Sequence, residues 1–300
     1  MLINQGLRVK SYTMNKAVKH FLIKKVTAGE GFEKSDTLSI EEPLEIRLEF
    51  GTEGKRVTQN IAVTMRTPGN DVELAAGFLF TEGIITNTSD IALIDHCFIT
   101  CAENKENVIK VSLQAGVIPN LTHAERNFYT TSSCGVCGKG SIQAIRTVSA
   151  FVKTMDKLVV DSDILLEFPH RLRGHQAIFA DTGGLHAAAL FDPTGNLLLL
   201  MEDVGRHNAL DKLIGSALLK GLLPLNRSVL LLSGRASFEL VQKAAMAGIR
   251  LIAAIGAPSS LAVELAEEFN ITLAGFLRDD HFNIYTSAHR IVLPVHENTH

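Results

Sequence analysis

Cysteine is scarce in this chain, and two other features that would define its class are missing. Four cysteines among 300 residues are too few for a small secreted scaffold held together by disulfides. No uninterrupted run of about eighteen apolar residues occurs, so we expect no transmembrane helix and no membrane partner. The net charge of −3 lacks the basic excess that nucleic-acid binding requires. We therefore expect a cytoplasmic protein whose thiols are free, metal-bound or catalytic.

The N-terminal segment "MLINQGLRVKSYTMNKAVKHFLIKKV" also lacks the features of a secretory signal. It has no uninterrupted apolar core and no cleavage signature of small residues. Its basic run, Lys16, Lys19, Lys24 and Lys25, is typical of a solvated tail. We predict that residues 1–30 form an irregular lead-in.

The next hundred residues predict a small α+β domain. The chain is 46% hydrophobic and 20% charged, enough to bury a substantial core. Residues 38–50 alternate in hydrophobicity, and residues 57–67 follow after a turn, which is typical of paired strands. Residues 68–85 indicate a helix, and a second strand pair follows it. We assign this domain to residues 31–126.

Residues 127–300 predict a different architecture, in which strands and helices alternate. Strands are expected at 228–234, 249–256 and 271–277, and helices at 206–221, 236–248 and 258–269. Residues 174–204 are expected to hold two strands around a "DPTGN" turn, with a helical stretch near 182–190. Near-continuous apolar strands indicate a sheet covered by helices. The fold class is therefore α/β, with an α+β domain followed by a layered α/β domain.

The stretch "TTSSCGVCGKGSIQAI" places Cys134 and Cys137 in a loop rich in Gly and Ser, ahead of a helix-like segment. One interpretation is structural zinc, with Cys97 and Cys101 completing four thiolate ligands. However, "CFITC" resembles a strand more than a ligand-presenting loop. Zinc deaminases need a Glu two residues after a His, and "LHAAAL" has an alanine there. Deamination is therefore excluded.

Two further interpretations of the cysteine pair use its reactivity. A thioredoxin-like redox pair would have its C-x-x-C directly after a strand, whereas here a long polar segment precedes Cys134. A nucleophilic or carrier cysteine needs a thiolate favoured by a helix N-terminus and a cation. Lys139 lies nearby, and the glycines of the loop allow close approach of a second macromolecule. Cys97 and Cys101 are more typical of core thiols.

Several motifs, taken together and in order, resemble one family. They are "EEPLEIRL", "VTMRTPGNDVELAAGFLFTEGII", "SSCGVCGK", "TGGLHAAAL", "EDVGRHNALDKLIG", "LLLSGRASFELVQKAAMAGI" and "FNIYT". The chain resembles the FdhD family, the formate dehydrogenase accessory sulfurtransferases, from about residue 40 to residue 286. The resemblance implies a cytidine deaminase-like fold for the second domain, without zinc chemistry.

The resemblance also implies a function. Family members receive sulfur from a cysteine desulfurase as a cysteine persulfide. They pass it to the molybdenum cofactor of formate dehydrogenase, in its bis(molybdopterin guanine dinucleotide) form. The first cysteine of the family's loop is the persulfide carrier and matches Cys134, and the second matches Cys137. We hypothesise that Cys137 releases the terminal sulfur by attacking the persulfide. The alternative function is a non-catalytic chaperone that delivers the cofactor and has a structural or zinc-bound cysteine pair.

Loops after the predicted strands of the second domain are candidates for binding this polyanionic cofactor. Backbone N–H groups at helix N-termini and arginine side chains suit phosphate, and open α/β sheets bind ligands at the carboxyl ends of strands. The candidates are Ser233, Gly234, Arg235 and Ser259, joined through the resemblance by Phe276, Leu277, Arg278, Asp279, Asp280 and His281. Each loop alone is equally compatible with an ordinary helix cap.

This chain departs from the family at Asp279, where a glycine commonly follows the arginine. Two carboxylates beside Arg278 weaken the case for a phosphate contact, and we expect them to accept hydrogen bonds from a guanine edge instead. A homodimer would suit a cofactor with two pseudo-symmetric halves. We expect no permanently bound metal.

Two histidine motifs remain open from the sequence. "EDVGRHNALDK" groups Glu202, Asp203, Arg206, His207 and Asp211, as an acid/base constellation or as a helix start with ordinary surface charges. In "TGGLHAAAL", His186 lines a cleft with Thr182, or it is a satisfied core histidine.

Overall fold

The computed structural model describes most of the chain. The described residues are 17–97, 106–121, 151, 157–176 and 182–294. Cys101, Cys134 and Cys137 lie outside them, as does most of the helix expected after the cysteine loop.

The first half of the chain forms a hairpin, a four-stranded sheet and one helix. Their bounds are β1 Val18–Thr27, β2 Glu30–Ser39, β3 Glu42–Thr52, β4 Lys55–Arg66, α1 Asp71–Thr81, η2 Thr88–Asp90, β5 Ile91–His96 and β6 Val108–Leu113. The sheet has the order β4-β3-β6-β5, with β3 and β6 parallel and the other neighbours antiparallel. The two strand pairs and the helix predicted here are confirmed.

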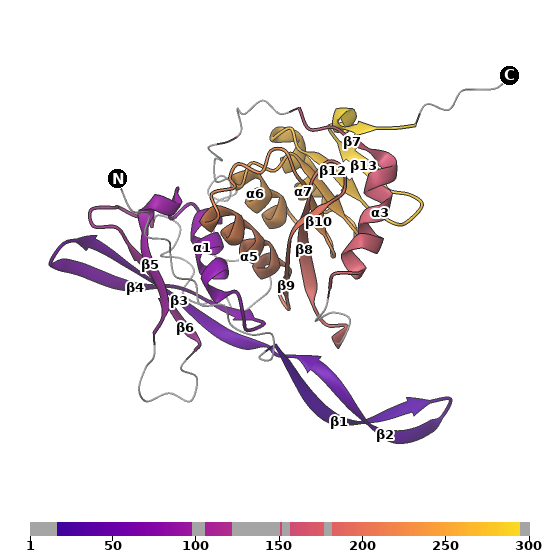
Figure 1. Ribbon diagram of the computed structural model, residues 1–300, viewed down its shortest axis with the longest axis horizontal. Helices are drawn as coiled ribbons and strands as arrows, with labels where there is room; N and C mark the ends of the chain where they lie inside the picture. The colour runs from indigo at the N-terminus through magenta and orange to yellow at the C-terminus, as the bar shows by residue number, and fades with distance from the viewer. Residues whose placement is uncertain (1–16, 98–105, 122–150, 152–156, 177–181, 295–300) are drawn as a thin grey trace.

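The expected irregular lead-in differs from the structure between residues 18 and 30. β1 and β2 pair antiparallel over their whole length and extend away from the body of the molecule (Figure 1). Ala28 and Gly29 both have positive φ, the backbone of a tight two-residue hairpin turn. Lys19, Lys24 and Lys25 are exposed on this hairpin, because a two-stranded ribbon has no core to exclude them. Lys16 lies outside the described residues.

The second half forms a six-stranded sheet with helices on both faces. The bounds are β7 Val160–Asp161, α3 Ser162–Arg173, β8 His186–Phe191, β9 Leu197–Asp203, α5 Arg206–Leu219, β10 Val229–Leu232, α6 Phe238–Met246, β11 Leu251–Ala254, α7 Ser260–Glu268, β12 Thr272–Gly275, β13 Asn283–Thr286, η4 Ala288–Arg290 and β14 Ile291–Val292. The large sheet has the order β13-β12-β11-β10-β8-β9. The layered α/β architecture predicted for this half is confirmed.

The sheet is buried on both faces because its strands alternate between two apolar clusters. Leu230 and Leu232 of β10 belong to the cluster formed with α5, α6 and α7, while Val229 and Leu231 belong to the cluster formed with α3. Figure 1 shows α3 on one face of the sheet and the other three helices on the opposite face. One local expectation is corrected here, and one helix is new. The segment near "TGGLHAAAL" forms strand β8 rather than a helix, since it pairs with both β9 and β10. Helix α3 was not predicted.

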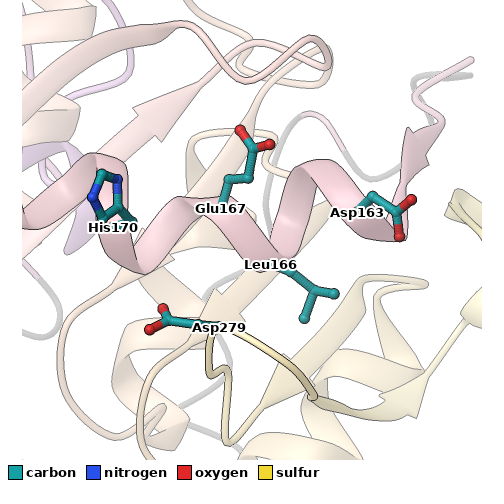
Figure 2. A pocket seen from close by; sticks show the side chains of 5 residues that line it. All are labelled: Asp163, Leu166, Glu167, His170 and Asp279. Atoms are coloured by element: carbon teal, nitrogen blue, oxygen red, sulfur yellow. The ribbon is translucent and has the colours of Figure 1, made fainter.

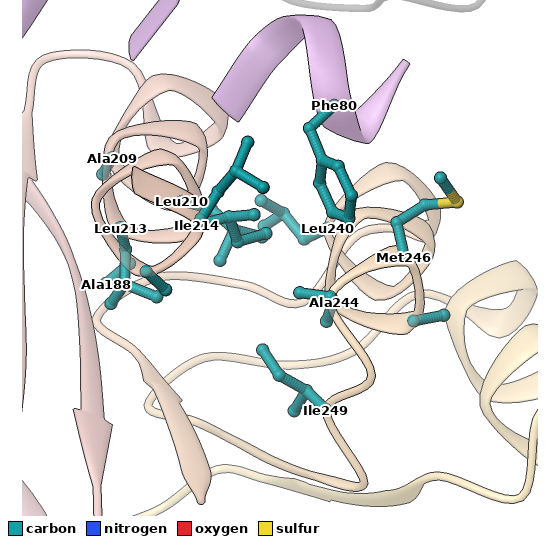
Figure 3. Packing of buried hydrophobic residues seen from close by; sticks show 14 of the residues in the cluster. Phe80, Ala188, Ala209, Leu210, Leu213, Ile214, Leu240, Ala244, Met246 and Ile249 are labelled. Carbon is teal, nitrogen blue, oxygen red and sulfur yellow. The ribbon is translucent and has the colours of Figure 1, made fainter. Parts of the chain in front are cut away.

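The two halves share one hydrophobic cluster, because α1 packs directly across α5. Phe80 of α1 lies over Leu210 and Ile214 of α5 and beside Leu240 of α6 (Figure 3). The layers are therefore the four-stranded sheet, α1, the α5–α7 layer, the six-stranded sheet and α3 (Figure 1). Of the helices described here, none is both long and apolar enough to cross a membrane.

Candidate functional site at the carboxyl edge of the large sheet

The described cysteine, Cys97, follows β5 and carries a half-buried free thiol. Its amide donates to the carbonyl of Val108 at 2.9 Å, so it continues the pairing of β5 with β6. The predicted carriers Cys134 and Cys137 lie outside the described residues. Among the residues that the structure does describe, no three or more His, Cys, Asp or Glu side chains are placed to hold a metal ion.

The predicted cofactor loops meet at the carboxyl ends of β10, β11 and β12. The N–H of Gly256 donates to the carbonyl of Gly234 at 2.9 Å, and the N–H of Phe276 donates to that of Gly256 at 3.1 Å. These bonds continue the sheet ladder beyond the strands. They place Ser233, Gly234 and Arg235 in a row with Phe276 along one edge, where ligands of open α/β sheets bind.

Glycine is required at two points of this edge by close packing. A Cβ at Gly256 would lie 2.9 Å from Cγ of Arg235 and 3.0 Å from its amide nitrogen. A Cβ at Gly234 would lie 3.2 Å from Nδ1 of His186. His186, the first residue of β8, therefore lies against the β10 loop. This contact places His186 beside the edge, and its role in a cleft with Thr182 stays a prediction.

Two of the predicted serines are engaged by the protein itself. The hydroxyl of Ser233 accepts from the N–H of Ala187 at 2.8 Å. The hydroxyl of Ser259 accepts from the N–H of Ala262 at 3.2 Å and caps α7. Arg235, by contrast, is exposed and has no ion pair or side-chain hydrogen bond among the described residues. Of these loop residues, Arg235 is the side chain available to a ligand.

The segment from Phe276 to Arg278 divides between the edge and the interior. Phe276 has φ +53° and is 40% exposed. A bulky residue in this left-handed region has a strained backbone, and such strain is concentrated at functional positions. Leu277 is buried in the core. The guanidinium of Arg278 donates to the carbonyls of Ile255 at 2.6 Å and Leu277 at 2.8 Å, which fixes the loop.

The carboxylates after Arg278 are already paired. Asp279 accepts from Arg173 of α3 at 3.2 Å, and Asp280 lies 2.7 Å from Nδ1 of His281. Asp279 also lines an open pocket of about 440 Å³ on the α3 side, together with Asp163, Leu166, Glu167 and His170 (Figure 2). The guanine contact predicted for Asp279 would therefore compete with its ion pair to α3.

Asp203 and Asp211 of "EDVGRHNALDK" form buried ion pairs, which does not fit the acid/base interpretation of this motif. Asp203 is fully buried and forms an ion pair with Lys212 at 2.7 Å. Asp211 is buried beside Lys243 at 2.9 Å. Burial raises the pKa of Asp211 and opposes the attraction of that lysine. Both pairs lie where α5 meets the first half of the chain, since Lys212 donates to the carbonyl of Thr67.

The histidines and arginine of these motifs lie on the edge instead. Nε2 of His207 lies 3.0 Å from the carboxylate of Glu239, in the first turn of α6. Burial lowers the pKa of His186, and the positive charges of Arg206 and His207 lower it further. The lowered pKa favours the uncharged form of the His186 ring. Glu239 was not among the predicted site residues, and no local pattern links it to His207.

Comparison with known proteins now defines the class of the molecule. Residues 40–292 match the model of the FdhD/NarQ family, and the chain belongs to that family. A crystal structure provisionally assigned as a formate dehydrogenase accessory protein from Desulfotalea psychrophila is similar in fold. It has a TM-score of 0.67 and 24% identity, and the match covers 92% of this chain and all of that one.

Individual relatives are similar over nearly their full length. The chain is 55% identical to the sulfur carrier protein FdhD of Mycolicibacterium paratuberculosis, over 89% of this chain and 96% of the relative. It is 52% identical to the protein of the same name in Streptomyces avermitilis, over 87% and 90%. The one from Saccharolobus solfataricus is 41% identical, over 93% and 100%.

Proposed function

We propose that this protein is a sulfur carrier in the maturation of formate dehydrogenase. The observation that carries the proposal is the near full-length similarity to proteins named sulfur carrier protein FdhD, in a chain that contains the Cys134–Cys137 loop. Cys134 is the carrier. Its thiolate attacks the outer sulfur of a persulfide on a cysteine desulfurase, a new S–S bond forms, and the donor's thiolate leaves with its electron pair.

The second step delivers that sulfur to the molybdenum cofactor, which is a substrate here. The thiolate of Cys137 attacks Sγ of Cys134, and the outer sulfur leaves as sulfide with the electron pair of the broken bond. The sulfur is reduced and the two cysteines are oxidised to a disulfide. A cellular dithiol then reduces the disulfide for the next cycle. A homodimer is part of the proposal, since it matches a cofactor with two similar halves.

The cofactor is proposed to bind along the edge formed by Ser233, Gly234, Arg235 and Phe276. The exposed guanidinium of Arg235 suits a phosphate, and the exposed ring of Phe276 offers a stacking surface for guanine. Ser259 contributes the capped N-terminus of α7 rather than its hydroxyl. The loop through His281 holds Phe276 in position.

The carrier step is tested by intact-protein mass spectrometry after incubation with a cysteine desulfurase and cysteine. We expect one added sulfur atom on the wild type and none on Cys134→Ala. Cys97→Ala is the matched control, because its thiol is free but half-buried, and it should load as the wild type does. A wild type that gains no sulfur, or a Cys134→Ala variant that still gains it, contradicts the proposal. Zinc on the unloaded wild type would favour the delivery chaperone with a metal-bound cysteine pair.

The guanine contact is tested with Phe276→Gly. Loss of stacking should weaken GDP binding about tenfold. The melting temperature should stay the same or rise, since glycine adopts φ +53° without the strain of a phenylalanine. Titration calorimetry and thermal unfolding measure both effects. Phe276→Tyr keeps the ring and should keep the affinity. Equal GDP affinity of Phe276→Gly and wild type would contradict the stacking role.

A further inference from the structure

Arg206 is an unusual side chain at the carboxyl edge, because its Nε is buried without an acceptor. It is the first residue of α5, and the described residues provide neither a hydrogen bond to that Nε nor a carboxylate paired with the guanidinium. Leaving a buried cationic donor unsatisfied is destabilising, and such a group in a native structure requires an explanation. An anionic ligand would supply the missing acceptor.

The carboxylates near Arg206 are committed elsewhere. Asp203 accepts from the N–H groups of Thr67 and Gly205 in addition to its ion pair with Lys212. Glu239 lies against His207. Glu202 precedes Asp203 in β9, and alternation along the strand directs its side chain to the other face of the sheet. The first turn of α5 contains no acidic residue.

His186 lies on the face of the sheet that α5 covers. It pairs with Asp203 across β8 and β9, and Ala188, two residues further, packs into the cluster beneath α5. Nδ1 of His186 is the atom that a Cβ at Gly234 would meet. Arg206 and His207 lie close enough for their charges to act on the ring of His186. The group therefore combines the guanidinium of Arg206 with two histidine rings, beside the exposed Arg235.

We propose that Arg206, His186 and His207 form an anion site that binds a phosphate or diphosphate group. The site lies on the β8 and α5 side of Gly234, whereas Phe276 lies on the β12 side, so the two occupy opposite parts of the same edge (Figure 1). The inference rests on the proposed function in one respect, since it assumes that the bound phosphate belongs to the same nucleotide cofactor. Planar guanidinium groups and histidines recognise phosphate oxygens through directed N–H donors.

Inorganic pyrophosphate tests the site without the cofactor or the cysteines. Histidine ring signals are followed by NMR against pH with and without pyrophosphate, and His186→Asn assigns the signal of interest. A dianion beside Arg206 should raise the pKa of His186 by about one unit, because it offsets the positive charge that now lowers it. In Arg206→Gln the rise should be lost and pyrophosphate affinity should fall about tenfold.

Two variants make the outcome specific. Arg206→Lys keeps the charge and should keep most of the pKa rise, which a purely structural role would not predict. Arg227→Gln removes an exposed arginine without a described partner, at the opposite end of β10, and should behave as wild type. The inference is overturned if pyrophosphate leaves the His186 signal unchanged, if Arg206→Gln responds as wild type does, or if acetate has the same effect. Sulfur loading of Cys134 is measured separately, so its failure is distinguishable.

Discussion

Gly77→Ala should destabilise this protein strongly, although alanine is the better helix former. Gly77 of α1 and Gly215 of α5 lie at the crossing of their helices. A Cβ at Gly77 would lie 1.9 Å from the carbonyl oxygen of Asp211 and 2.8 Å from the amide nitrogen of Gly215. A Cβ at Gly215 would lie 1.9 Å from the carbonyl oxygen of Glu73. The obstructing atoms are backbone, so the helices must separate to admit a methyl group.

The expected loss of unfolding free energy is about 3 kcal/mol, at the upper end for overpacked cores. The melting temperature should fall by about 6 °C or more. Helix propensity alone predicts that the same change raises the unfolding free energy by about 1 kcal/mol. A loss of stability would therefore identify the close contact between α1 and α5 as its cause. Thermal and denaturant unfolding measure it.

Gly174→Ala is the matched control, since Gly174 is exposed, has φ −66°, and the nearest atom to its Cβ would be 3.6 Å away. It should change stability by less than about 0.5 kcal/mol. If Gly77→Ala and Gly174→Ala were equally stable, α1 would not pack on α5 at this distance, and the shared core of the two halves would be in doubt.

The parts of the fold that the sequence predicts are those with strong local patterns. Strands β10, β11 and β12 are short apolar runs, and each follows a segment with a helical pattern, α5, α6 and α7 respectively. Helix α3 escapes prediction because Pro169 lies within it, where proline normally ends a helix. The β1–β2 hairpin escapes because its strands are held only by each other, which leaves no buried face to impose a pattern.

The candidate site also has a part that the sequence predicts and a part that it does not. Its loops were predictable, since carboxyl ends of neighbouring strands must meet at one edge. The grouping of His186 with Arg206 was not, because it depends on the pairing of β8 with both β9 and β10. The burial of Asp203 and Asp211 was also unpredictable. Lys212, the partner of Asp203, belongs to the same motif, but it is buried by packing against Thr67 of the first half of the chain. Lys243, the partner of Asp211, comes from α6 and lies outside the motif.

Cys134→Ala should abolish maturation of formate dehydrogenase. In cells that lack their own sulfur carrier and express this chain with a client enzyme, formate-dependent dye reduction should fall at least about a hundredfold. A covalent carrier has no substitute once its nucleophile is removed. The melting temperature should not change, and the client should still contain molybdenum and guanine nucleotide, because only the transferred sulfur is missing. Cys97→Ala should keep full activity.

Cys137→Ala separates the two steps of the proposed cycle. This variant should load sulfur on Cys134 as the wild type does, yet fail to release it, so that the persulfide accumulates while the client stays inactive. Full activity of Cys137→Ala would contradict the proposed attack of Cys137 on Sγ of Cys134. The acceptor would then have to take the sulfur directly from Cys134. Full activity of Cys134→Ala would contradict the carrier function itself. If Cys134→Ala and Cys137→Ala lost zinc and thermal stability together, the pair would be a structural metal site, because metal binding and folding are coupled.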